Sequence, residues 1–109
     1  MLQVDDRVRT IEAYTYDRYV RGARVSPIDE SEAVRFLDDY YSKPARRKDP
    51  NCGYAGILWF EVSFQDTEDE PRACLERARE LLLRAREVST APWEAIEERL
   101  TDIEDMLSD

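Results

Sequence analysis

Histidine is absent from this chain of 109 residues, and only two cysteines and three glycines are present. Without an imidazole, Ser-His and Cys-His catalytic pairs cannot form, and a zinc site built from sulfur and imidazole is excluded as well. Cys52 and Cys74 are too few for a disulfide framework, so we expect both to be reduced. So few glycines also leave no glycine-rich phosphate loop.

Long apolar runs are missing too. No stretch approaches the roughly 20 apolar residues of a membrane-spanning helix, and the first residues have neither the basic region nor the apolar core of a secretory signal. We therefore expect a cytoplasmic protein that does not enter a membrane. With 42% hydrophobic residues, the chain fits one domain over residues 1–109 with a modest core.

Charge is abundant and unevenly placed. Charged residues make up 38% of the chain, and the net charge is -9. Acids and bases balance over residues 1–60, so the net charge belongs to residues 61–109. A local basic cluster spans Lys43 to Lys48. We therefore predict a bipolar molecule whose acidic end attracts basic partners and repels nucleic acid and anionic membranes.

The C-terminal third is predicted to be a helical hairpin. Apolar residues at spacings of three and four predict a helix over 92–107, with its N-cap at Thr90 or Ala91. The residues of this stripe are Trp93, Ile96, Leu100, Ile103 and Leu107. A similar pattern predicts a helix over 71–88, and the acidic run 66–70 supplies cap acceptors. The short break between these helices favours an antiparallel pair.

A third helix is predicted near residues 28–41. Either Ser26 before Pro27, or Asp29 with Glu32 as a capping box, could start this helix, and Pro44 is expected to stop it.

Residues 57–64 have the alternating apolar pattern of a β-strand. A lone strand would leave its backbone groups unpaired, and residues 8–25 are the available partner. We interpret 8–25 as a strand or hairpin, although the same residues also fit a helix ended by Gly22. The predicted fold is therefore α+β: a small antiparallel sheet packed by a central helix and a C-terminal antiparallel helical hairpin. Exposed sheet edges, together with Ile57 and Trp59, also predict a homodimer.

Catalytic and metal-binding signals are weak. Cys52 lies near Arg47 and Lys48, which could lower its pKa, but an ordinary loop thiol is the simpler interpretation. Glu61 beside Trp59 is the carboxylate whose surroundings could raise its pKa, yet an outward-facing strand residue is simpler. The run 66–70 lacks the spacing and the glycine of a calcium loop. We expect no catalytic residue, no metal site and no cofactor, and hence no enzyme.

The polar side of the last predicted helix is rich in carboxylates. Its candidate partner-binding residues are Glu94, Glu97, Glu98, Asp102 and Asp105. A rigid acidic helix is what an inhibitor presents to a basic cleft. We therefore predict a non-catalytic acidic protein-binding module of the inhibitor, immunity or anti-defence type, acting on a basic partner surface.

The basic loop 43–48 supports an alternative, binding of nucleic acid or a phosphate ligand. Its cations could contact phosphates while nearby tyrosines stack on bases. The candidate residues are Lys43, Arg46, Arg47, Lys48, Tyr40, Tyr41 and Tyr54. A solvated loop is the simpler interpretation, and docking of the loop on the acidic hairpin of a second copy is a third.

Overall fold

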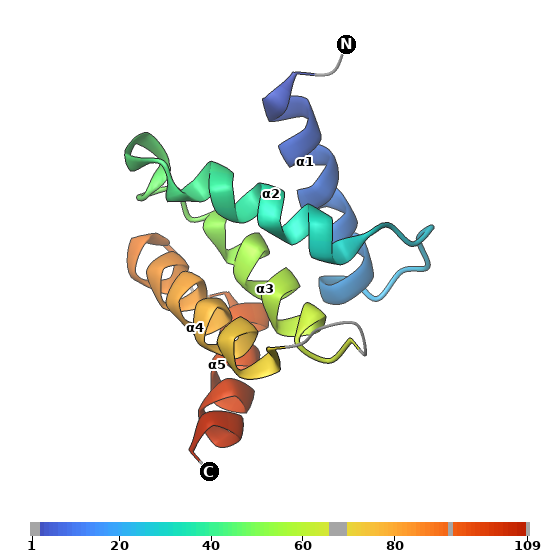
Figure 1. Ribbon diagram of the computed structural model, residues 1–109. Coiled ribbons are helices and arrows are strands. Elements are labelled where there is room, and N and C mark those ends of the chain that lie inside the picture. The colour runs from blue at the N-terminus through green and yellow to red at the C-terminus, as the bar shows by residue number, and fades with distance from the viewer. Residues whose placement is uncertain (1–2, 66–69, 92, 109) are drawn as a thin grey trace.

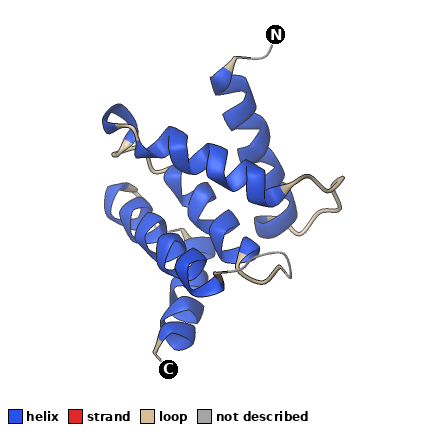
Figure 2. Ribbon diagram, viewed as in Figure 1, coloured by secondary structure: helices blue, strands red, loops and turns tan. Residues whose placement is uncertain are grey.

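The computed structural model describes residues 3–65, 70–91 and 93–108. All regular secondary structure in these ranges is helical (Figure 1). The elements are α1 (Val4–Thr15), a π-helical turn (Tyr16–Val20), α2 (Glu30–Ser42), a 3₁₀ turn (Pro44–Arg46), α3 (Cys52–Val62), α4 (Pro71–Val88) and α5 (Glu94–Leu107). Figure 2 shows no strand in this described part of the chain. The predicted α+β fold with an antiparallel sheet is therefore wrong.

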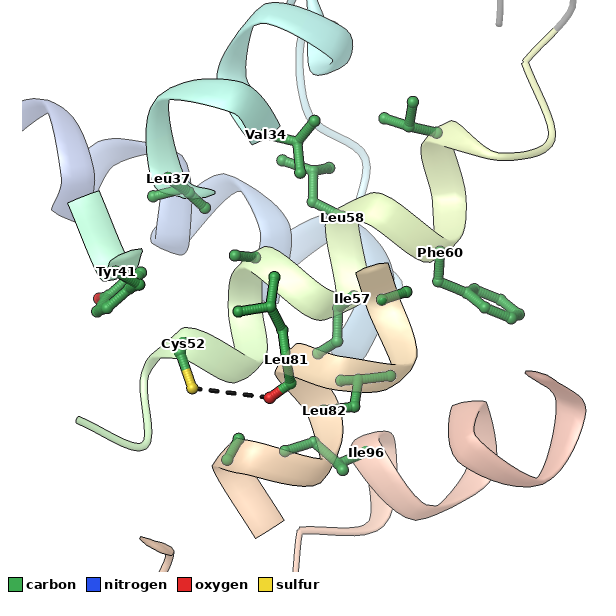
Figure 3. Packing of buried hydrophobic residues seen from close by; sticks show 14 of the residues in the cluster. Val34, Leu37, Tyr41, Cys52, Ile57, Leu58, Phe60, Leu81, Leu82 and Ile96 are labelled. Carbon is green, nitrogen blue, oxygen red and sulfur yellow. Dashed lines mark hydrogen bonds between the residues drawn. The ribbon is translucent and has the colours of Figure 1, made fainter. Parts of the chain in front are cut away.

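Helix α3 lies at the centre of the fold and contacts α1, α2, α4 and α5. Figure 3 shows Val34 of α2 on one side of α3 and Leu81 and Leu82 of α4 on the other. A helix buried on all faces is apolar all round and has no polar stripe. This explains the wrong prediction of a strand at 57–64, because a short apolar run does not distinguish a buried strand from a buried helix. Inside a helix the backbone groups pair locally, so no partner strand is required.

The segment 8–25 takes the helical alternative that the sequence also allowed. Val8 and Ile11 of α1 are buried in the core. The helix then widens into the π-helical turn, where the backbone N–H of Arg21 donates to the carbonyl of Tyr16 at 2.8 Å. The chain leaves this turn at Gly22, whose φ of 74° is in the left-handed region that favours glycine.

The three helices predicted from periodicity are all present. The Asp29 side chain caps α2 by accepting from the backbone N–H of Glu32 at 3.0 Å, as predicted. Helix α4 has the predicted bounds. Helix α5 begins at Glu94 with Trp93 as its N-cap residue, instead of Thr90 or Ala91. Residues 66–69 of the acidic run and Pro92 lie outside the described residues.

Two ion pairs join α4 and α5 in antiparallel order. Arg86 lies 3.4 Å from Glu97, and Arg79 lies 3.6 Å from Glu104. The residue numbers of these pairs fall along α4 as they rise along α5, so the two helices are antiparallel. This is the arrangement predicted for a helical hairpin.

The helices α3 and α4 approach closely because α3 carries glycine at the contact. A Cβ atom on Gly56 would lie 2.7 Å from Leu82 Cγ and 3.2 Å from the Leu82 backbone nitrogen. A Cβ on Gly53 would lie 2.8 Å from the Trp93 ring and 2.9 Å from Ile96. Such distances are shorter than normal packing allows, so both glycines are needed for the observed helix spacing.

The sheet-based reasons for self-association are not found in the described residues, whereas the separation of the basic loop from the acidic C-terminal part remains. The described residues contain no sheet edge, Ile57 is buried, and the Trp59 indole donates to Asp38 at 2.7 Å. Self-association itself stays a prediction. Within the same ranges, no helix combines the length and apolar character that crossing a bilayer requires.

The substitution Gly56→Ala tests the contact between α3 and α4. We expect it to destabilise the protein by about 1 to 3 kcal/mol, because overpacking outweighs the better helix propensity of alanine. Urea denaturation of Gly56→Ala, Leu82→Ala and the double variant would measure the coupling. The double variant should lose less unfolding free energy than the two single variants lose in sum, since Leu82→Ala removes the clash. Simple additivity would contradict this packing.

Candidate functional site

Helix α5 is held in place by its apolar side. Ala95, Ile96, Leu100 and Ile103 are all buried. The helix is therefore part of the core, and its polar side faces outward in a fixed orientation.

The carboxylates of α5 divide into two groups. Glu97 and Glu104 face α4 and pair with its arginines. The others are exposed, and their spacings of four, four and three place them along one face of the helix. We call this group the acidic stripe: Glu94, Glu98, Asp102 and Asp105. None of them has an ion pair with another described residue, so of the five predicted site residues only Glu97 has an ion pair within the described ranges.

A hollow of about 290 Å³ lies beside the first half of the acidic stripe, between α5 and the π-helical turn. We call it the α5 hollow. Its lining residues are Tyr19, Val20, Trp93, Glu94, Ala95, Glu98 and Arg99. Sequence reasoning missed this feature because the π-helical turn and α5 are far apart in the chain, and no local pattern joins them.

Arg99 forms one wall of the hollow, but its charge is directed inward. Its side chain is 12% exposed, and its Nη2 lies 3.6 Å from Glu61 Oε1. The same nitrogen donates to the Tyr19 carbonyl at 3.0 Å, and Nη1 donates to the Ala95 carbonyl at 3.1 Å. The two terminal nitrogens of Arg99 are thus bound to the protein itself, while its buried Nε has no hydrogen-bond partner among the described residues.

Glu61 is the partner of Arg99 and lies near the end of α3, so the prediction of an outward-facing strand residue is wrong. Burial raises the pKa of the Glu61 carboxyl, while the charge of Arg99 acts in the opposite direction and the charge of Glu30 adds to the increase. The surroundings of Glu61 raise its pKa, as expected, but burial also raises the pKa of Glu12, so Glu61 is not the one carboxylate with this property.

Glu30 forms a second buried cluster nearby. It accepts hydrogen bonds from the hydroxyls of Tyr14 and Tyr19 and from Gln65, the last at 2.7 Å. Arg18 lies 3.4 Å from the same carboxylate. Below the hollow, Glu30 and Glu61 therefore each have an arginine, whereas Glu94 and Glu98, which line it, have no ion pair with a described residue.

Two of the four cations of the basic loop, Lys43 and Arg46, are paired within the chain. Lys43 lies 3.7 Å from Asp39. Arg46 lies over the Tyr40 ring, 4.0 Å from its centroid, and 4.0 Å from Asp5. The Tyr40 hydroxyl also donates to Asp5, at 2.9 Å.

The other tyrosines of the alternative site face the interior. Tyr41 is fully buried and donates to Glu12, and Tyr54 packs edge-on against Trp93. Arg47 and Lys48 are exposed and have no ion pair with other described residues. The structure therefore does not bring the predicted cations and tyrosine rings together on one exposed face.

Cys52 is the first residue of α3, not a loop residue, and it is fully buried. Its thiol donates to the Leu81 carbonyl at 3.7 Å, and burial raises its pKa to about 11, so activation by Arg47 and Lys48 is absent. Cys74 is buried on α4, as expected for a small residue on a helix face. No group of side chains in the described ranges is arranged to hold a metal ion.

A larger hollow, of about 530 Å³, lies where α2, α3 and α4 meet. Its polar centre is Asp38, which accepts from Trp59 and twice from Arg77, at 2.7 and 2.8 Å. The Arg77 guanidinium also donates to Glu80 and Ser42. These groups are satisfied by one another, which indicates a structural connection between three helices.

The buried Glu61 carboxyl should make stability depend on pH. A raised pKa means that the folded state binds the proton more tightly than the unfolded state. The stabilisation that protonated Glu61 provides is complete below the pKa that Glu61 has in the unfolded chain. It is lost as the pH rises through the pKa that Glu61 has in the folded protein. Compared with Glu61→Gln, the wild type should therefore lose stability between about pH 4 and neutrality. Urea denaturation of both proteins across this range would measure the difference, and a pH-independent difference would contradict it.

Comparisons with protein-family models, with curated protein sequences and with solved structures find no significant match to this chain.

Proposed function

We propose that this chain is a non-catalytic binding module whose acidic stripe binds a basic surface on a partner protein, in the manner of an inhibitor, immunity or anti-defence protein. The observation that carries the proposal is the separation of charges on α5. Acids that face α4 have arginine partners, whereas the exposed stripe has none among the described residues. An outside cation would complete this arrangement.

Energetics also favour an external partner. Glu94, Glu98 and Asp102 follow one another at intervals of four residues, and each such like-charged pair costs a few tenths of a kcal/mol in an isolated helix. The core does not require these charges, because the buried apolar side already fixes α5. Binding of a basic surface would remove the repulsion.

The fixed orientation of α5 suits rapid recognition. A charged face that is already ordered loses little conformational entropy on binding. Its field attracts a basic partner over roughly the Debye length, about 8 Å at physiological salt. The stripe is therefore expected to accelerate association more than it slows dissociation.

Reversal of the stripe tests the proposal. The stripe variant carries Glu94→Lys, Glu98→Lys, Asp102→Lys and Asp105→Lys. The control variant has the same change in net charge on exposed acids of other surfaces: Asp6→Lys, Asp39→Lys, Glu76→Lys and Glu87→Lys. In affinity capture from the native host followed by mass spectrometry, the wild type and the control should retain the same basic protein, and the stripe variant should lose it.

Kinetics with the purified partner would complete the test. Raising the salt concentration from low to physiological strength should reduce the association rate steeply and change dissociation little. Circular dichroism would verify that both variants remain folded. If the folded stripe variant captures the same partner with the same salt dependence, the stripe is a solvated surface and the proposed function is wrong.

A further inference from the structure

We propose that the α5 hollow receives one arginine side chain of the basic partner. This inference rests on the proposed function and adds the residue type that is recognised. It follows from the combination of carboxylates, aromatic rings and limited volume at one place on the surface.

Two carboxylates of the stripe lie at the hollow. Glu94 and Glu98 are one helical turn apart, both are exposed, and both line it. A guanidinium group has five N–H donors in a planar fork, so it can donate to two neighbouring carboxylates at once. Hydrogen bonds between ionised groups are stronger than those between neutral groups.

Two aromatic residues also belong to the lining of the hollow. Tyr19 and Trp93 line it, and the Trp93 ring is oriented by an edge-on contact with Tyr54, with ring centroids 5.0 Å apart. Guanidinium groups pack favourably on aromatic faces. The protein uses this contact itself, since Arg18 lies 5.3 Å from the Tyr19 ring centroid.

The interior beneath the hollow does not repel a cation. Arg99 is balanced by Glu61, and Arg18 is balanced by Glu30. Glu94 and Glu98 therefore determine the sign of the local potential. The volume, about 290 Å³, is at the lower end of the range for small-ligand pockets, which suits a single side chain better than a cofactor.

The position of the hollow is also consistent with a binding role. It lies against a π-helical turn, and such turns occur often at functional sites. The same turn contributes Tyr19 to the lining of the hollow, and the Tyr19 hydroxyl donates to Glu30 at 2.6 Å. One wall of the hollow is thus anchored in the core.

The first experiment uses N-acetyl-arginine methylamide and its citrulline analogue, which has nearly the same shape without the charge. In NMR titrations, the arginine compound should shift the indole N–H signal of Trp93 in a saturable manner. The Trp59 indole, which donates to Asp38, serves as the internal reference. An unchanged Trp93 signal, or an equal response to citrulline, would overturn the proposal.

The second experiment compares two pairs of substitutions with equal charge loss on the same stripe. Glu94→Gln with Glu98→Gln changes the hollow, whereas Asp102→Asn with Asp105→Asn changes the stripe beyond it. The first pair should weaken binding of the arginine compound by about tenfold or more, because charge-assisted hydrogen bonds are lost. The second pair should change it by less than about twofold, since screened charges farther away contribute little.

A labelled octa-arginine peptide separates failure of this inference from failure of the proposed function. If both pairs weaken the peptide equally, the stripe acts through diffuse charge and only the arginine site is wrong. If neither pair changes the affinity and salt has no effect, the acidic stripe does not bind cations and the proposed function fails as well. If the Glu94 and Glu98 substitutions weaken peptide binding more than the Asp102 and Asp105 substitutions do, the result supports both the arginine site and the proposed function.

Discussion

The packing of α4 and α5 against α3 depends on two positions that lack a side chain. At Gly56 the backbone of α3 approaches Leu82, and at Gly53 it approaches Trp93 and Ile96. This close approach places an apolar helix at the centre, where all of its faces are covered by other helices. The surrounding helices need only one apolar side each, so their outer sides are available for charge.

Buried charges are the second constraint on the fold. Glu12, Glu30, Asp38 and Glu61 are acids that pack between helices, and each has an arginine or tyrosine partner from the chain itself. Because an unpaired buried charge is costly, these pairs restrict how the helices can be arranged. Exposed acids, by contrast, are either paired at the surface, like Glu97 and Glu104, or have no ion pair with a described residue, like those of the acidic stripe.

The candidate site is a consequence of that division. Helix α5 uses its apolar side and its two ion pairs with α4 for folding, and the acidic stripe remains for recognition. The π-helical turn then adds Tyr19 and Val20 to a lining that also includes Trp93, Glu94 and Glu98. The site therefore combines a charge pattern on one helix with a hollow made by two distant segments.

Local periodicity in the sequence determined α2, α4 and α5, because each has one apolar side. Tertiary structure alone decided α3, since a helix covered on every face loses its periodic signal and resembles a buried strand. It also decided which charges are free. In the sequence, Tyr41, Arg46 and Glu97 look equally available to bind a partner. In the structure each contacts another residue of the chain: Tyr41 contacts Glu12, Arg46 contacts Tyr40, and Glu97 contacts Arg86. Pairing between distant residues is not encoded in local spacing, and for that reason the α5 hollow became visible only in the folded chain.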